Sequence, residues 1–423
     1  MRVHTPAPAD WQWSKVKHVA EFFTGWTPPT GNAESFEGEN LWANISDLGG
    51  RRELANTAKR ISDQAVRASS IKLSPRGSVL FSFKLSIGQV AFAGRDMYTN
   101  EAIATFPPQQ GFCTRWAYYA FPIFIPQNAG ENIYGAKLLN QELIRSADLL
   151  MPPRDVQERI VNFLDDKTAR IDTLIAEKER LCNVLVEQRL SVAERVIDGS
   201  GGKPLAKLGF YAELLPGYPF ASDHFSKDSA EVPLLRGVNV SPGRVRWDDT
   251  VYWPRPTDAS LHRFLLREGD VVLGMDRPWI STGARVAMID AASEGALLLQ
   301  RVCRLRGLGH IHQRFIFYAL ASDRFRQSVE VEMTGVSVPH ISPDQVLSFK
   351  IPVLSLAAQE QRCKLADEEI SRIEQLVRHT TAMLDRLREY RSSLISAAVT
   401  GQLDLGAYEA TSVPDLASEL VES

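Results

Sequence analysis

Polar side chains that can bind nucleic acid gather in two parts of the sequence that are rich in arginine and turn residues. Arginine, asparagine and glutamine read base edges, whereas lysine, arginine, serine and threonine hold phosphates. These residue types predict a DNA-facing surface, although each residue taken singly is equally well explained as a solvated surface side chain. The candidates are Asn44, Ser46, Arg51, Arg52, Lys84, Ser86 and Gln89 in the first part, and Arg236, Asn239, Arg244, Arg246, Arg277, Ser281 and Arg285 in the second.

One tetrapeptide, Asp276-Arg277-Pro278-Trp279, is a candidate for catalysis. It is similar to the Asp-Pro-Pro-Trp/Tyr motif with which amino-methyltransferases hold a flipped adenine. An arginine replaces the first proline, and no glycine-rich loop for S-adenosylmethionine accompanies the motif. The sequence also lacks phosphate-loop, dinucleotide-binding, nucleophile-elbow and zinc-protease motifs. We therefore interpret the tetrapeptide as a DNA-contacting loop or a turn, and predict that the chain itself catalyses nothing.

Part of the sequence occurs twice, at an offset of 202 residues. Eleven residues are identical between 157–199 and 359–401 without a gap, well above chance at ordinary residue frequencies. Such an unbroken register indicates one long element present in two copies. The identical pairs include Gln157 with Gln359, Asp165 with Asp367, Arg189 with Arg391, and Gly199 with Gly401.

Each copy has the pattern of a long amphipathic helix. Neither proline nor glycine interrupts Asp155 to Asp198 or Ser355 to Thr400, and Gly199 and Gly401 follow where a left-handed helix cap favours glycine. Roughly 44 residues would span about 66 Å. Apolar residues at a 3-then-4 spacing predict a coiled-coil seam, and chain order requires the two helices to run antiparallel. The alternative is that each helix packs on its own domain. The predicted spacer residues are Ile171, Leu174, Leu181, Leu185, Ile373, Leu376, Leu387 and Leu394.

The rest of the sequence predicts two mixed β-rich domains, so the fold class is α+β with a pseudo-two-fold repeat. Short apolar runs with turn-rich borders predict strands, and the repeat persists faintly: 77–80 matches 269–272, and 115–120 parallels 314–319. We place the domains at 1–150 and 203–350, the long helices within 151–202 and 351–405, and a flexible acidic tail at 406–423. The shared fold with diverged loops suggests that the domains read different targets.

Charge, apolar content and cysteine spacing limit the classes of protein to which the chain can belong. The 423 residues have a formal net charge of −3, yet 1–150 and 203–350 each carry two more basic than acidic residues, which is compatible with DNA on the domains. No apolar run reaches the roughly 20 residues needed to cross a bilayer, and the N-terminus lacks a hydrophobic signal core. We expect a cytoplasmic protein. The scattered Cys113, Cys182, Cys303 and Cys363 predict free thiols and no metal site.

The segment 151–172, which begins Met-Pro-Pro-Arg-Asp-Val-Gln-Glu-Arg-Ile, carries a family resemblance. It resembles the Pro-Pro-x-x-x-Gln-x-x-Ile…Leu…Ile-Asp segment that opens the central helix of specificity subunits of type I restriction–modification systems. The second copy, from Ile351-Pro352 through Gln359 to Leu403, is similar but has Arg362 where Ile160 stands. The resemblance covers essentially the whole chain as domain–helix–domain–helix.

This resemblance implies a non-catalytic subunit whose two target-recognition domains each read one half of a bipartite double-stranded DNA sequence. The helices would set the spacer and dock two methyltransferase subunits. Those partners, with two motor-nuclease subunits, would carry S-adenosylmethionine, ATP and magnesium, so this chain would hold no cofactor of its own. Two alternatives remain at this stage: a stand-alone DNA adenine methyltransferase, and a coiled-coil protein scaffold.

Overall fold

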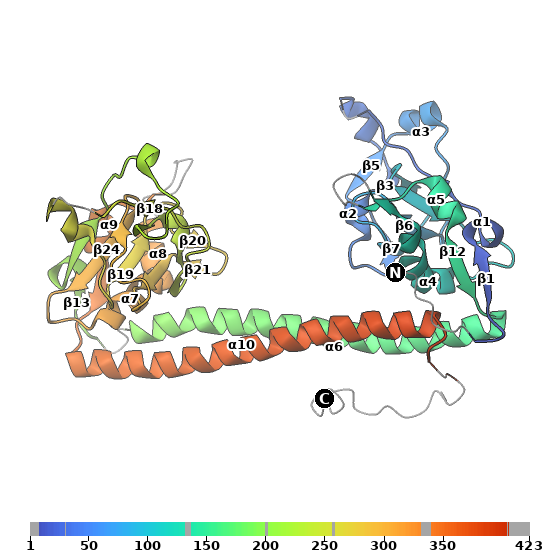
Figure 1. Cartoon of the computed structure of the whole chain (residues 1–423). Helices are drawn as coiled ribbons and strands as arrows, with labels where there is room; N and C mark the ends of the chain where they lie inside the picture. The colour runs from blue at the N-terminus through green and yellow to red at the C-terminus, as the bar shows by residue number, and fades with distance from the viewer. Residues whose placement is uncertain are drawn as a thin grey trace. The chain divides into compact units, whose positions relative to one another are not determined.

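The computed structural model divides the chain into two compact units (Figure 1). It describes residues 8–29, 31–131, 137–198, 202–255, 259–330, 340–403 and 405. Unit 1 contains residues 1–175 and 385–423, and unit 2 contains residues 176–384. Each unit therefore combines one domain, which we call a lobe, with parts of both long helices. The predicted acidic tail, 406–423, and Gly199 lie outside the described residues.

Lobe 1 is built around a five-stranded sheet with the order β2-β9-β6-β7-β4, beside a three-stranded sheet with the order β5-β3-β8. A separate antiparallel pair, β1 with β12, joins the two ends of the lobe. The described strands are β1 Gln12–Lys15, β2 Phe23–Thr24, β3 Asn40–Ala43, β4 Glu53–Leu54, β5 Lys59–Ile61, β6 Val79–Ser82, β7 Val90–Ala93, β8 Tyr98–Thr99, β9 Ile103–Phe106, β10 Gly130–Glu131, β11 Lys137–Leu138 and β12 Asp148–Met151.

Helix α4 covers the central strands of lobe 1. Its buried side chains include Trp116, Tyr119 and Phe121, and the last of these rings packs against Phe106 of β9. Strand β6 is buried along its whole length, as expected for the middle of a covered sheet. The described helices are α1 Val16–Val19, α2 Ile45–Leu48, α3 Asp63–Ser69, α4 Thr114–Phe124 and α5 Gln141–Ser146, with short 3-10 turns η1 Ala33–Phe36 and η2 Ile125–Asn128.

Lobe 2 repeats this plan with a four-stranded sheet, β14-β24-β19-β22, and a three-stranded sheet, β18-β15-β23. Strands β13 and β25 pair as β1 and β12 do. The described strands are β13 Leu205–Lys207, β14 Ala212–Pro216, β15 Val232–Leu235, β16 Val240–Ser241, β17 Arg244–Val245, β18 Tyr252–Trp253, β19 Val271–Gly274, β20 Trp279–Ile280, β21 Gly283–Ala284, β22 Val286–Met288, β23 Leu297–Leu298, β24 Val302–Gly307 and β25 Lys350–Pro352.

Helix α7 takes the place of α4 in lobe 2. Phe315, Tyr318 and Leu320 of this helix enter a core that also contains Leu185 and Ile373 of the long helices. The described helices are α7 Gln313–Ala321, α8 Asp323–Glu330 and α9 Pro343–Ser348, with 3-10 turns η3 Leu208–Phe210, η4 Ser222–His224, η5 Gly237–Asn239 and η6 Ala259–Phe264. The shared fold of the two lobes, predicted from faint sequence matches, is thus visible in the main sheet, the three-stranded sheet, the helix that follows them and the pair of strands at the ends of each lobe.

A pair of matched glycines, one in each lobe, shows why some residues of the faint repeat are the same in both lobes. Gly25 follows β2 and Gly217 follows β14, and each lies against the backbone of a neighbouring segment. A Cβ atom would come within 1.7 Å of the Thr99 carbonyl oxygen at Gly25, and within 2.2 Å of the Leu299 carbonyl oxygen at Gly217. No side chain fits at either distance, so the fold itself requires glycine at both positions.

The long helices are α6, Arg154–Val196, with 43 residues, and α10, Leu356–Val399, with 44 residues. Both agree closely with the predicted spans. Gly401 has the left-handed φ of +74° expected of a helix cap, and the Gln402 N–H donates to the Ala397 carbonyl. None of the described helices is long and apolar enough to cross a membrane.

The helices run antiparallel where they meet within each unit, as predicted. In unit 1, Arg391 of α10 binds Asp172 of α6 through two N–H···O bonds of 2.7 and 3.1 Å. In unit 2, Arg195 pairs with Glu369 at 2.5 Å, and Arg362 donates to the carbonyl oxygens of Val196 and Asp198. Each helix also packs on a lobe, so helix pairing and lobe packing, treated above as alternatives, both occur.

The buried seam follows a 4-then-3 spacing, so part of the predicted seam is wrong. Ile171, Leu185, Ile373, Leu387 and Leu394 are buried as predicted. Leu174 is half-buried, whereas Leu181 and Leu376 are 40% and 52% exposed. The second seam position lies one residue later and includes Ile175, Cys182, Val377 and Leu384. Both spacings average 3.5 residues per turn and both rows are apolar, so periodicity alone could not choose between them.

Candidate nucleic-acid interface and lobe–helix junctions

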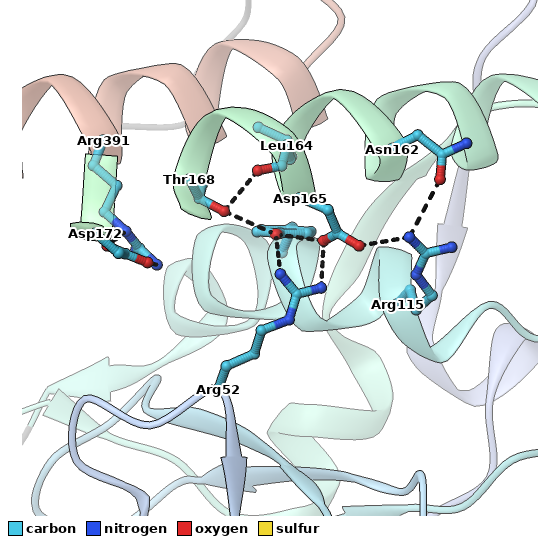
Figure 2. Close-up of polar contacts among 9 residues, drawn as sticks. Arg52, Arg115, Asn162, Leu164, Asp165, Thr168, Asp172 and Arg391 are labelled. Carbon is cyan, nitrogen blue, oxygen red and sulfur yellow. Dashed lines mark hydrogen bonds and ion pairs between the residues drawn. The ribbon is translucent and has the colours of Figure 1, made fainter. Parts of the chain in front are cut away.

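In unit 1 a single carboxylate fastens lobe 1 to helix α6 (Figure 2). Asp165 accepts hydrogen bonds from Arg115 at 2.5 Å and from the Tyr119 hydroxyl at 2.7 Å, and it also pairs with Arg52. Arg115 donates a second bond to Asn162 at 3.2 Å. We call Arg52, Arg115, Tyr119 and Asp165 the first clasp. Two lobe arginines and a hydroxyl converge on one helix carboxylate, which is a charge-assisted arrangement.

The electrostatics of the first clasp favour one protonation state. Burial alone raises the pKa of Asp165, but the hydrogen bonds from Arg115, Tyr119 and Arg52 outweigh it, so the pKa lies below its usual value. Burial raises the pKa of the Tyr119 hydroxyl far above its usual value. The carboxylate therefore stays charged and the hydroxyl stays a donor across the physiological range.

Unit 2 repeats the clasp with equivalent residues. Asp367 of α10 accepts from Arg314 at 2.6 Å, forms a second contact with the same guanidinium, and accepts from the Tyr318 hydroxyl. Hydrogen bonding to Asp367 raises the pKa of Arg314, although burial opposes it. We call Arg314, Tyr318 and Asp367 the second clasp. Sequence reasoning noted both repeats that supply these residues but did not predict that they meet.

A repeated glutamine holds the start of each long helix. Gln157 is 6% exposed and donates to the Pro152 carbonyl at 2.9 Å; Gln359 is 3% exposed and donates to the Leu354 carbonyl at the same distance. Gln359 also accepts from the His312 N–H at 2.8 Å. In the sequence, this pair was visible as two identical residues, Gln157 and Gln359, at an offset of 202. Both junctions are therefore built by the same side-chain chemistry.

Three predicted DNA-binding residues have internal roles. Arg52 belongs to the first clasp, so its guanidinium is directed to Asp165. Asn239 is 2% exposed, and its amide caps the Arg236 N–H at 3.0 Å and donates to the Arg246 carbonyl at 2.9 Å. Arg236 donates to the Asp249 carbonyl at 2.6 Å. Asn239 is the buried member of the three, and its side chain takes its partners inside the protein. Arg52 and Arg236 keep part of their surface exposed, and their contact with DNA stays a prediction.

Two further candidates organise a turn. Asn44 caps helix α2, accepting from the Ser46 N–H at 2.8 Å and from the Ser46 hydroxyl at 2.6 Å. Its own N–H donates to Asp47 at 2.9 Å, as the Arg236 N–H donates to Asn239 in lobe 2. The asparagine and serine thus stabilise a turn that both lobes share. Arg246 is exposed and paired with its neighbour Asp248.

The remaining candidates stay available for DNA. Two of them, Gln89 and Arg285, are half-buried and stand at matched positions; the Gln89 Oε1 and Arg285 Nε atoms are buried without a hydrogen-bond partner among the described residues. The exposed candidates are Arg51, Lys84, Ser86, Arg244, Arg277 and Ser281. Their contact with DNA remains a prediction.

The tetrapeptide considered for catalysis has other partners. The Asp276 carboxylate lies 2.6 Å from the His340 Nδ1 atom and 3.5 Å from Arg301. Its oxygen is therefore engaged in a local charged cluster. Within the described ranges, His, Cys, Asp and Glu side chains form no group of three or more that could hold a metal ion.

Comparisons with known proteins agree with this architecture. Residues 8–181 match the family model of the type I restriction modification DNA specificity domain. The chain is 31% identical over 182 residues to the type I restriction enzyme EcoAI specificity subunit of Escherichia coli, covering 43% of this chain and 30% of that protein. It is 22% identical over 286 residues to the MjaVIII specificity subunit of Methanocaldococcus jannaschii, covering 64% and 65%. The matches thus span less than two thirds of either relative.

Solved structures extend the likeness to nearly the whole chain. A chain solved in work on complex assembly and conformational transition of the type I R-M system superposes with a TM-score of 0.73 at 14% identity, covering 94% of this chain and 100% of that one. The HsdS subunit from Thermoanaerobacter tengcongensis gives a TM-score of 0.52 at 14% identity, covering 95% and 99%. Lobe 1 with the first part of α6 thus matches the type I restriction modification DNA specificity domain. The chain is similar to type I specificity subunits over this region, and similar in fold to solved structures over nearly its whole length.

Proposed function

We propose that this chain is the DNA-recognition subunit of a type I restriction–modification complex. Each lobe reads one half of a bipartite, asymmetric DNA target, and the long helices set the spacer between the halves. The observation that carries the proposal is the duplicated unit: the same lobe fold, the same Arg–Tyr–Asp clasp and the same glutamine occur twice. A chain that presents two alike but diverged lobes suits a target with two different halves.

The proposal assigns the chemistry to partners. Two methyltransferase subunits would dock on the helices and bring S-adenosylmethionine, and two motor-nuclease subunits would bring ATP and magnesium. The chain itself would act by positioning, in the cytoplasm where the DNA and these partners are found. The stand-alone methyltransferase is disfavoured because Asp276, its candidate for binding a flipped adenine, is occupied by His340 and Arg301.

Salt dependence tests whether the lobes bind DNA through phosphates. If about six phosphates are contacted, affinity should fall roughly 10³-fold between 50 and 200 mM salt. We expect Arg244→Ala, which removes an exposed cation, to lower the logarithmic salt slope by about one. Fluorescence anisotropy with a labelled duplex that carries the target, measured on the chain with its methyltransferase, gives both numbers.

The matched control is Arg154→Ala, since Arg154 lies on α6 and pairs with Glu158 at 2.9 Å. It should leave the slope unchanged. Equal affinity at low and high salt would contradict DNA recognition and favour a protein scaffold.

A further inference from the structure

Two hairpins occupy the same place in the two lobes. In lobe 1, β6 and β7 are joined by residues 83–89. In lobe 2, β19 and β22 are joined by residues 275–285, which contain the further antiparallel pair β20–β21. A left-handed glycine precedes each hairpin: Gly77 has φ +84° and Gly269 has φ +85°. The first residue after each strand bonds to the same neighbouring segment, Phe83 to Ala102 and Met275 to Arg301. The opening strands β6 and β19 therefore match at an offset of 192 residues, whereas the closing strands β7 and β22 match at 196, because the connection in lobe 2 is four residues longer.

At the offset of 192 residues both hairpins hold a non-glycine residue in a left-handed conformation. Leu85 has φ +60° and Arg277 has φ +46°. Side chains other than glycine, asparagine and aspartate rarely adopt this backbone conformation, because the Cβ crowds the following carbonyl. Retained strain of this kind concentrates at functional sites. Two residues of unrelated chemistry keep the same strained backbone, which indicates that their position matters more than their local stability.

Both left-handed residues are exposed, and hydrogen bonds order the chain next to each of them. Leu85 is 95% exposed, so nearly its whole side chain is open to a partner. The buried Ser82 hydroxyl accepts from the Gln89 N–H at 3.1 Å and donates to the Ser86 carbonyl, so the base of the hairpin is ordered. In lobe 2, Arg277 is exposed, while its neighbour Asp276 is held by His340.

The closing end of each hairpin carries a second matched feature. The Gln89 carbonyl accepts from the Ser82 N–H across the first hairpin, and the Arg285 carbonyl accepts from the Gly274 N–H across the second. Each also leaves a buried side-chain atom unpaired among the described residues. Unpaired buried polar atoms are uncommon and call for a partner. Each hairpin thus offers an exposed residue after its opening strand and an unsatisfied buried polar atom just before its closing strand.

We propose that Leu85 and Arg277, the matched exposed residues that follow the opening strand of each hairpin, determine base specificity, one in each half-site; this inference rests on the proposed function. Leu85 acts by apolar contact with a base, either a thymine methyl or an opened base step. Arg277 acts by donating hydrogen bonds to a base edge, for which guanine is the preferred acceptor. Lys84 and Ser86, which flank Leu85, are exposed and suited to the adjacent phosphates.

The chemistry of the pair favours DNA over a protein partner as the occupant. Two copies of one methyltransferase would present identical surfaces to the two lobes. A pocket that accepts a leucine does not accept an arginine, because the guanidinium would lose its water without gaining partners. Two different DNA half-sites present different surfaces, so the two lobes can contact them with different side chains. Leu85 and Arg277 hold the same place in the two lobes but differ in side-chain chemistry. This is the pattern expected of residues that read different bases.

The test uses the full chain co-expressed with its methyltransferase, with methylated adenines mapped across the host genome. Arg277→Ala should relax one base position in one half-site by roughly 5- to 100-fold, and Leu85→Ala should relax one base position in the other half-site. Leu85→Gly, which also removes the backbone strain, should fold at least as well and relax the same position as Leu85→Ala. Leu73→Ala and Arg267→Ala, exposed residues of the same types in the same lobes, serve as controls and should change nothing.

The outcomes separate this inference from the proposed function. If the unmodified complex methylates no bipartite motif, the proposed function fails. If it methylates one and the Leu85 and Arg277 variants keep the same motif with the same preference at every position, the inference about these two residues alone is overturned. Relaxation of both half-sites by one variant would also contradict it, because each residue is assigned to a single half.

Discussion

Inserting four residues into both long helices should change the spacer of the target and leave both half-sites unaltered. The insertion points are between Ile175 and Ala176 on α6 and between Leu384 and Asp385 on α10, where the chain divides into its two units. Four residues add about 6 Å of helix. DNA rises about 3.4 Å per base pair, so the preferred spacer should lengthen by one or two base pairs. Mapping methylated adenines in cells that express the variant with its methyltransferase measures the new spacer directly.

The control places the same four residues within 406–423, beyond the end of α10, where the helix lengths do not change. That variant should keep the original spacer. If the helix variant instead changed the bases of a half-site, or kept the original spacer with full activity, the helices would not be the element that measures distance.

Removing the central carboxylate of either clasp should loosen its lobe on the helix. Asp367→Ala leaves Arg314 and Tyr318 without their shared acceptor, and Asp165→Ala does the same to Arg115, Tyr119 and Arg52. Hydrogen bonds to charged groups contribute about 2 kcal/mol, so each substitution should lower the free energy of unfolding by about that amount. Urea unfolding measures the loss, and hydrogen exchange should show faster exchange in α4 for Asp165→Ala and in α7 for Asp367→Ala.

Glu360→Ala is the matched control, because Glu360 is an exposed acidic residue on the same helix as Asp367. The pH profile adds a check specific to the clasp. The pKa of Asp165 is lower in the folded chain than in the unfolded chain, so its stabilisation is present above the unfolded value of about 3.9 and is lost as the pH falls through the folded value. The stability difference between the natural chain and Asp165→Asn should therefore shrink below about pH 4. A difference that persisted in acid would point to packing rather than charge.

The repeat made the long helices predictable, but it did not settle which side chains they bury. Helix spans, the cap at Gly401 and the antiparallel direction follow from chain order and from residues that local helix geometry requires. The choice between Leu376 and Val377, or between Leu181 and Cys182, depends on which row meets its neighbours in three dimensions. Both rows of side chains are apolar, so the sequence around them does not show which row is buried.

The DNA-facing candidates show a different limit. Arg52 and Asn239 have the residue types of base readers, yet one fastens a lobe to a helix and the other fills a buried cap. Residue type alone does not distinguish a cation aimed at DNA from one aimed at Asp165. Leu85 was missed for the opposite reason: a leucine carries no sign in the sequence that its backbone is left-handed and its side chain exposed. The clasps could have been found, because the pairs Asp165 with Asp367 and Tyr119 with Tyr318 were already visible as repeats.

The most direct test of bipartite recognition is a map of methylated adenines in a host that expresses this chain together with its methyltransferase. We expect one motif with two defined half-sites of different sequence, separated by a spacer of fixed length and undefined bases. Expression of the methyltransferase without this chain should give no motif. A single contiguous motif, or the same methylation pattern with and without the chain, would contradict the account.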